Sequence, residues 1–195
     1  MVNAERFDQD GPYVLACTHA GHLEPALLTA TLRRPVHWVA RVEFFRPRWA
    51  ALLLKRVGAI PVDRNGVPVR TIRTCVRRLG EGQIIGIFPE GGRTTGPDQA
   101  VLGGPVRGGA CLIAMRAGVP VVPVVIRGLD AFHHIERWVP GRRTTVQTLV
   151  GQPILPADFT PRAARRTRRR EMTARLGRAF VDLYQQADAR AGGRT

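Results

Sequence analysis

Serine is absent from this sequence of 195 residues, and cysteine is scarce. Without serine the chain cannot be a Ser-His-Asp hydrolase, because that chemistry uses the serine hydroxyl as its nucleophile. The three cysteines, Cys17, Cys75 and Cys111, are odd in number and show no short paired spacing. This pattern argues against a disulfide framework and a zinc ribbon, and it is typical of a protein from a reducing compartment.

Long hydrophobic runs are also missing. The longest candidate covers residues 111–126 and is interrupted by Arg116, Gly118 and two prolines, so it falls short of the run of about 18 apolar residues that a spanning helix needs. The first residues of the chain carry no apolar stretch behind a basic one, as a secretory signal would. We therefore expect any contact with a membrane to be peripheral.

Acidic residues are few relative to basic ones: Lys+Arg number 30 and Asp+Glu 15, which gives a formal net charge of +15. A field of this sign draws a protein towards anionic lipid, nucleic acid or phosphorylated substrates. All of the basic residues except Lys55 are arginine, whose planar fork matches phosphate oxygens. A bias in genomic base composition would produce the same arginine count, so charge alone does not identify the partner.

The pattern of apolar residues predicts a single α/β domain, with a mixed, mostly parallel sheet flanked by helices, because short apolar runs alternate with segments of helical period. A composition that is 44% hydrophobic and 23% charged is typical of a globular protein. Strands are predicted at 12–18, 36–42, 60–63, 83–88, 119–126 and 144–150, and helices at 25–32, 47–57, 69–80, 106–117 and about 161–190.

The first predicted strand is followed by the segment C-T-H-A-G-H-L-E-P, which places His19 and Glu24 in one tight turn. A carboxylate there can hold one imidazole nitrogen and leave the other free to accept a proton. This is half of a catalytic triad without a nucleophile. Taken alone, the same pattern also fits a surface turn with no function.

Two further strand ends carry arginine. The segment P-E-G-G-R-T-T-G puts Glu90 and Arg93 on a turn whose glycines let backbone N–H groups approach an anion. The segment V-G-A-I-P-V-D-R-N-G brings Arg64 to the end of another strand. Open α/β sheets bind ligands at the carboxyl ends of their strands, so these residues predict a site for a phosphorylated substrate.

Taken in order, these segments resemble the motifs of the glycerolipid acyltransferase family, which includes 1-acylglycerol-3-phosphate acyltransferase. The resemblance extends over roughly residues 12 to 150 and includes the stretch V-R-G-G-A at 106–110. The four matching blocks are His19 with Glu24 for HxxxxD, 58–64 for the block that ends in arginine, 88–94 for F-P-E-G-T-R-S, and 119–126 for V-P-I-V-P-V.

The resemblance implies a glycerol-3-phosphate acyltransferase-like fold and an enzyme that moves a fatty acyl group from acyl-CoA or acyl carrier protein to a hydroxyl of a lysophospholipid. His19, oriented by Glu24, would act as general base on the acceptor, which attacks the thioester directly and leaves no covalent intermediate. The acceptor's phosphate and glycerol would be bound by Arg64, Glu90, Gly91 and Arg93. No metal and no cofactor other than the acyl donor are expected. The expected location is the cytoplasm, peripheral on the inner face of the membrane.

The chain departs from the family pattern in two blocks. Glu24 stands where the family has aspartate, one methylene shorter, and Pro25 follows it. Gly92 replaces the threonine of the third block, and Thr94 replaces its serine. An alternative reading is therefore a catalytically weak or inactive protein of the same fold that binds lipid or acyl carrier protein.

Two segments are candidates for an anionic membrane surface. The first is the arginine-rich start of the predicted carboxyl-terminal helix, 162–170, whose following apolar stripe is expected to pack on the domain; a merely solvated charge run is the alternative. The second is the apolar segment 45–54 with its flanking basic residues. For this segment core packing is the main expectation, and docking at a lipid interface is the alternative.

Other chemistries find little support. His19, His22 and Glu24 lack the helical H-E-x-x-H spacing of a metal site. Cys17 alternates with His19 on the predicted strand and is expected to be a small buried apolar side chain. A nucleic-acid-binding module built on the arginine tail remains a third possibility but lacks helix-turn-helix and aromatic RNP signatures, so no nucleic acid is expected as partner.

Overall fold

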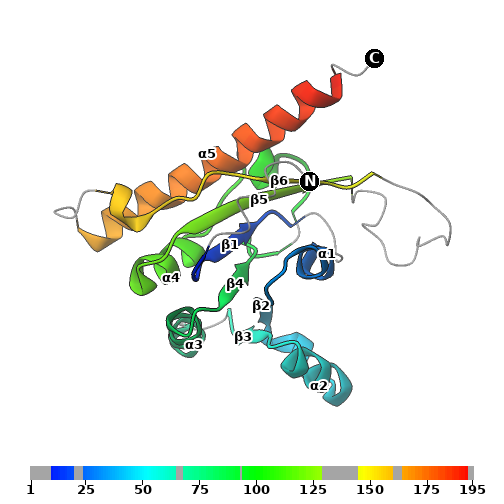
Figure 1. Cartoon of the computed structure of the whole chain (residues 1–195), viewed down its shortest axis with the longest axis vertical. Helices are drawn as coiled ribbons and strands as arrows, with labels where there is room; N and C mark the ends of the chain where they lie inside the picture. The colour runs from blue at the N-terminus through cyan, green and yellow to red at the C-terminus, as the bar shows by residue number, and fades with distance from the viewer. Residues whose placement is uncertain are drawn as a thin grey trace.

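One six-stranded sheet forms the centre of the computed structural model, in the order β3-β2-β4-β1-β5-β6 (Figure 1). The structure describes residues 10–19, 24–64, 68–92, 94–128, 145–159 and 164–192. The strands are β1 (Val14–Cys17), β2 (Val36–Arg41), β3 (Ile60–Val62), β4 (Ile84–Ile87), β5 (Val121–Arg127) and β6 (Gln147–Val150). The first five run parallel, and β6 pairs antiparallel with β5. The predicted fold class, an α/β domain with a mixed, mostly parallel sheet, is confirmed.

The helices of the described residues follow the predicted alternation closely. They are α1 (Glu24–Thr31), α2 (Arg48–Arg56), α3 (Val69–Gly80), α4 (Gly109–Ala117) and α5 (Arg165–Gly192), with short 3-10 helices η2 (Val42–Phe45), η3 (Gly96–Asp98), η4 (Ala100–Leu102) and η7 (Pro156–Asp158). The main difference is α4, which begins at Gly109 rather than at Val106. The backbone N–H of Arg107 donates to the carbonyl of Pro89 at 2.8 Å, and this bond ties the expected first turn to the loop after β4.

Helices cover both faces of the sheet. One face packs against α3, α4 and α5, and the other packs against α1, whose Leu28 is fully buried (Figure 1). Every residue of β1 and β4 is buried, as are the first six residues of β5. This burial on both faces explains why these strands read as continuous apolar runs instead of alternating with polar residues.

The long helix α5 lies along β5 (Figure 1). Its predicted apolar stripe is confirmed: the buried side chains are Met172, Leu176, Phe180, Leu183 and Ala187. The basic start of the helix lies beside Met115 and Arg116, at the end of α4 that precedes β5. It is therefore at the edge of the sheet where the parallel strands begin.

The carboxyl ends of the five parallel strands meet at the opposite edge. His19 follows β1, Arg64 follows β3 and Glu90 follows β4, so the sheet brings three predicted site residues to one edge. Arg127, the last residue of β5, lies at the same edge next to the strand that carries His19.

The apolar segment of α2 does not join the core. None of the residues of α2 is buried, and the side chains of Trp49, Leu52 and Leu53 are 74%, 68% and 56% exposed. Core packing was the main expectation for these three side chains, and it is wrong. Only the opposite side of the helix, with Ala50, Ala51 and Leu54, is partly covered.

Candidate active site

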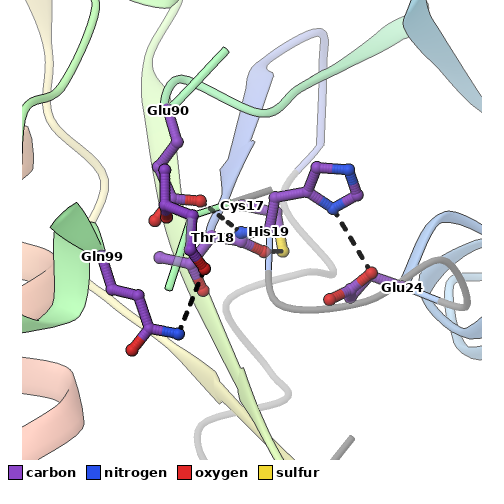
Figure 2. Close-up of polar contacts among 7 residues, drawn as sticks. Cys17, Thr18, His19, Glu24, Glu90 and Gln99 are labelled. Carbon is purple, nitrogen blue, oxygen red and sulfur yellow. Dashed lines mark hydrogen bonds and ion pairs between the residues drawn. The ribbon is translucent and has the colours of Figure 1, made fainter. Parts of the chain in front are cut away.

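His19 and Glu24 come together as their spacing predicts. Nδ1 of His19 lies 3.4 Å from Oε2 of Glu24, and Figure 2 shows the imidazole turned towards the carboxylate. The side chain of His19 is 18% exposed, whereas Glu24, the first residue of α1, is fully buried. This distance is longer than a well-formed hydrogen bond, and catalytic hydrogen bonds of this kind often tighten when substrate binds. With Nδ1 facing Glu24, Nε2 is the nitrogen available to a substrate.

An aromatic stack holds the other side of the imidazole. The ring of Phe88 stacks on His19 with centroids 4.2 Å apart, and Trp38 stacks on Phe88 at 4.9 Å. Trp38 is anchored through its indole N–H, which donates to the hydroxyl of Thr29 at 3.0 Å. The glycine of strand β4 makes room for the indole, since a Cβ on Gly86 would lie 2.4 Å from a Trp38 ring carbon. Trp38 lies in β2, Phe88 follows β4 and His19 follows β1, so the orientation of the imidazole depends on the strand order.

Glu90 holds the backbone at His19. It is only 7% exposed, and its Oε2 accepts a hydrogen bond from the backbone N–H of His19 at 2.6 Å. Its Oε1 accepts from the backbone N–H of Ala100, at the start of η4, at 2.9 Å. Figure 2 shows the Glu90 carboxylate between these segments. The sequence predicts that Glu90 binds substrate; the structure assigns both of its oxygens to the backbone, and contact with substrate stays a prediction.

Gly91 occupies a conformation and a position that suit glycine alone. Its φ is +79°, and a Cβ there would lie 2.5 Å from Nε of Arg107. Its N–H donates to the carbonyl of Phe88 at 3.1 Å and closes the turn after β4. The absence of a side chain thus lets the Arg107 guanidinium lie over the turn. The sequence assigned no role to Arg107, although the V-R-G-G-A stretch contains it.

Arg64 belongs to a group of arginines on the β3 side of His19. A Cβ on Gly92 would lie 3.8 Å from Nη1 of Arg64, so this guanidinium borders the turn after β4. Partial burial and then the positive charges of Arg41 and Arg107 lower the pKa of Arg64 from its ordinary value. Positive groups gathered around Arg64 in this way favour an anion among them. Arg93, the other predicted phosphate ligand, lies outside the described residues.

A cavity of about 300 Å³ opens on the other side of His19. Its lining includes Thr18, His19, Glu90, Arg127 and Tyr184. The guanidinium of Arg127 stacks 4.4 Å above the Tyr184 ring and pairs with Asp188 of α5. Its Nη1 is buried without a hydrogen-bond partner among the described residues. Arg64 is not among the residues that line this cavity, and a cleft shared by the imidazole and the predicted arginines stays a prediction.

Sequence reasoning missed Arg127, and the only available signal was its position directly after the fourth block, at the end of β5. Such strand ends are where open α/β sheets bind ligands.

Cys17 behaves as an apolar core residue. It is fully buried, and burial, followed by the negative charges of Glu24 and Glu90, raises the pKa of its thiol well above the ordinary value of 9.0. A thiol that keeps its proton is a poor nucleophile.

Among the residues that the structure describes, no three His, Cys, Asp or Glu side chains gather closely enough to hold a metal ion. Within the same residues, no helix combines the length and apolar character needed to cross a bilayer.

Comparison with known proteins gives three findings. The family model described as acyltransferase matches residues 1–127. A 1-acyl-sn-glycerol-3-phosphate acyltransferase from Bacillus subtilis is 30% identical over 189 residues, 96% of this chain and 89% of the relative. A protein of the same description from Borreliella burgdorferi is 24% identical over 134 residues, 68% of this chain and 52% of the relative.

A solved structure shares the fold. The crystal structure of the 1-acyl-sn-glycerophosphate acyltransferase from Thermotoga maritima matches with a TM-score of 0.64 at 20% identity, covering 93% of this chain and 70% of that chain. The family model spans well over half of the present sequence, and the Bacillus relative aligns along nearly all of it. This chain therefore belongs to the acyltransferase family and is an enzyme of that family.

Proposed function

We propose that this enzyme transfers a fatty acyl group from acyl-CoA or acyl carrier protein to a free hydroxyl of a lysophospholipid, with 1-acylglycerol-3-phosphate as the leading acceptor. The observation that carries the proposal is the pairing of His19 with a buried Glu24 at an edge of the sheet where arginines also gather. The names of the curated relatives support the choice of acceptor.

The chemistry needs no nucleophile from the protein. Nε2 of His19 takes the proton of the acceptor hydroxyl as its oxygen attacks the thioester carbonyl carbon and forms a C–O bond. Collapse of the tetrahedral intermediate breaks the C–S bond, and the departing thiolate takes the proton from the imidazolium. The carboxylate of Glu24 stabilises the imidazolium between these two steps. General base action of this kind contributes about 10² to 10⁴ in rate, and positioning and oxyanion stabilisation supply the rest.

The glutamate of the first block is compatible with this role. The backbone of Glu24 is the start of α1, and the extra methylene still brings Oε2 to 3.4 Å from the imidazole. The alternative, a protein of the same fold that binds lipid without turnover, requires that this pair be unable to polarise an acceptor. Comparison of wild type, Glu24→Asp and His19→Ala separates the two, because only an active site loses turnover when the imidazole is removed.

The acceptor's phosphate is proposed to lie at the arginines on the β3 side of His19. Arg64 and Arg93 are assigned this role by resemblance, and the charge of Arg107, which borders the same turn as Arg64, supports an anion at this place. A phosphate there would face several guanidinium groups, which bind phosphate oxygens through paired N–H donors.

The deciding experiment is an assay of purified protein against a panel of acyl-CoA and acyl carrier protein donors and of lysolipid acceptors. Release of free thiol and formation of ester are measured together, since direct transfer requires one of each per turnover. His19→Ala is the blank. Release of thiol without formation of ester would indicate hydrolysis of the donor. If no combination of donor and acceptor gave either thiol or ester, the proposal would be contradicted.

We also propose that the enzyme works while bound peripherally to an anionic lipid surface. A lysophospholipid with a long acyl chain resides in membranes, and a net charge of +15 favours an anionic surface. Location in the cytoplasm on the inner face of the membrane is part of the same proposal. The structure offers more than one basic surface for this contact.

A further inference from the structure

We infer that η2 and α2 form the surface that docks on an anionic bilayer and brings the catalytic edge to its lipid substrates. This docking surface is defined by Phe44, Trp49, Leu52, Leu53 and Val57 together with Arg46, Arg48, Lys55 and Arg56. The inference rests on the proposed function for its biological purpose, because a lipid acceptor explains why an enzyme exposes such a surface.

The first argument is that α2 carries its most apolar side outward. The five apolar side chains of the docking surface are between 55% and 74% exposed. Trp49, Leu52 and Leu53 follow one another at the spacing of one helix face. The side turned to the protein is built from small or partly covered residues, and α2 packs mainly against η2. Large apolar side chains are usually buried, so an exposed apolar stripe of this size indicates a surface that binds a membrane or another molecule.

The second argument is charge. Four basic residues flank the stripe, and the one acidic residue of η2 and α2, Glu43, pairs with Arg41 at 2.9 Å. All four basic side chains are exposed, so their charges are available to headgroups. Apolar side chains flanked by arginine and lysine are the pattern of a helix that lies in a membrane interface. These positive charges attract an anionic bilayer, and they repel a second copy of this basic chain.

The third argument is position. Arg41 ends β2 and directly precedes η2, so the docking surface begins at the edge where His19 and Arg64 lie. The arginine-rich start of α5, the other basic candidate, lies at the edge where the strands begin, next to Arg116. Docking through α5 would turn the catalytic edge away from the bilayer. Docking through α2 keeps the acceptor's phosphate close to the arginines that are proposed to bind it.

The test measures binding of the full chain to vesicles of phosphatidylcholine with phosphatidylglycerol by co-sedimentation. We expect Trp49→Ala, Leu52→Ala and Leu53→Ala each to weaken binding by about tenfold, because each removes a large side chain from the interface. Leu102→Ala and Leu155→Ala are matched controls, since these leucines are 54% and 46% exposed elsewhere on the molecule. They are expected to bind like wild type.

A second readout comes from Trp49 itself. Its fluorescence is expected to shift to shorter wavelength on vesicles and to be quenched by brominated lipid, and Trp49→Phe should remove this change. Lys55→Glu with Arg56→Glu is expected to weaken binding to anionic vesicles, whereas Arg165→Glu with Arg166→Glu in α5 is not. The inference would be overturned if only the α5 pair lost binding, or if the three α2 substitutions left binding unaffected. It would also be overturned if the wild-type protein bound no vesicles and instead self-associated through α2, as measured by sedimentation velocity.

Failure of this inference can be told apart from failure of the proposed function. Activity on a short-chain, water-soluble acceptor without vesicles is expected to be unchanged in the α2 variants, and activity on vesicle-borne acceptor is expected to fall. An α2 variant that loses both activities alike would contradict a docking role. A wild-type protein that binds vesicles through α2 but turns over no acceptor would contradict only the proposed function.

Discussion

Replacing Glu90 by glutamine tests whether this residue positions the backbone of His19 or binds the substrate. The carboxylate accepts two backbone hydrogen bonds, from His19 at 2.6 Å and from Ala100 at 2.9 Å, in a nearly buried place. A glutamine offers one oxygen and one NH₂ group. It can therefore keep only one of the two bonds, and its NH₂ group must face the other backbone N–H, donor against donor.

The expected cost follows from this geometry. A hydrogen bond to a charged acceptor contributes about 1.5 to 3 kcal/mol, and a buried N–H left without an acceptor costs about 1 to 3 kcal/mol. We therefore expect Glu90→Gln to lower the free energy of unfolding by about 2 to 5 kcal/mol. For a chain of this length that is a fall in Tm of roughly 5 to 15 °C. Because Glu90 ties the backbone of His19 to that of Ala100, loss of either bond loosens this link, and a displacement of the imidazole by about 1 Å would also lower kcat by about 10².

The assay is thermal unfolding followed by circular dichroism, combined with steady-state kinetics in which the acceptor concentration is varied. Glu81→Gln is the matched control, since Glu81 forms an exposed i,i+4 pair with Arg77 and such pairs contribute less than about 1 kcal/mol. A positioning role predicts a lower Tm and kcat with an unchanged acceptor KM. A raised KM with Tm and kcat intact would refute this reasoning and support direct binding of substrate by Glu90.

Four further predictions follow from the site. Glu24→Gln is expected to lower kcat by about 10² to 10⁴ without raising KM, because the imidazolium loses its counter-charge; steady-state kinetics measures this. Gly86→Ala should cost about 1 to 3 kcal/mol of stability and lower kcat, since the new methyl group overlaps the Trp38 ring, and chemical denaturation reports the loss. Arg107→Ala is expected to raise the acceptor KM by about tenfold or more while kcat changes little. Cys17 should resist iodoacetamide in the native protein at pH 8.5, and because the unfolded thiol ionises near 9.0 while the folded one keeps its proton, its contribution to stability falls as pH rises above about 9.

Each of these predictions has an outcome that contradicts it. An unchanged kcat in Glu24→Gln would remove the carboxylate from the mechanism. Wild-type stability in Gly86→Ala would mean that the aromatic stack is loose. Arg116→Ala, an exposed arginine at the end of α4, is the control for Arg107→Ala, and an equal effect on KM would reduce the role of Arg107 to general charge. Alkylation of native Cys17 would show an accessible thiolate.

Local patterns in the sequence were enough for the fold class and for the proximity of His19 and Glu24. Apolar runs and helical spacing follow from backbone geometry, so they placed the strands and most helix boundaries correctly. His19 and Glu24 are five residues apart in the sequence, and so short a separation keeps them close whatever the rest of the chain does. The sequence also predicted which strand ends meet at one edge of the sheet, because parallel strands end on the same side.

Long-range packing decided the remainder of the site. The stack of Trp38, Phe88 and His19 exists because β2, β4 and β1 are neighbours in space. The local periodicity of apolar residues does not predict the order of strands in a sheet. The same is true of Arg127 beside the His19 cavity and of Glu90, whose bonds reach across 71 and 10 residues. An amphipathic pattern likewise says that α2 has two unlike sides but not which one faces the protein. By itself the sequence determined which residues form each element and carry charge; only the tertiary structure decided which of them meet, because that depends on how distant elements share one core.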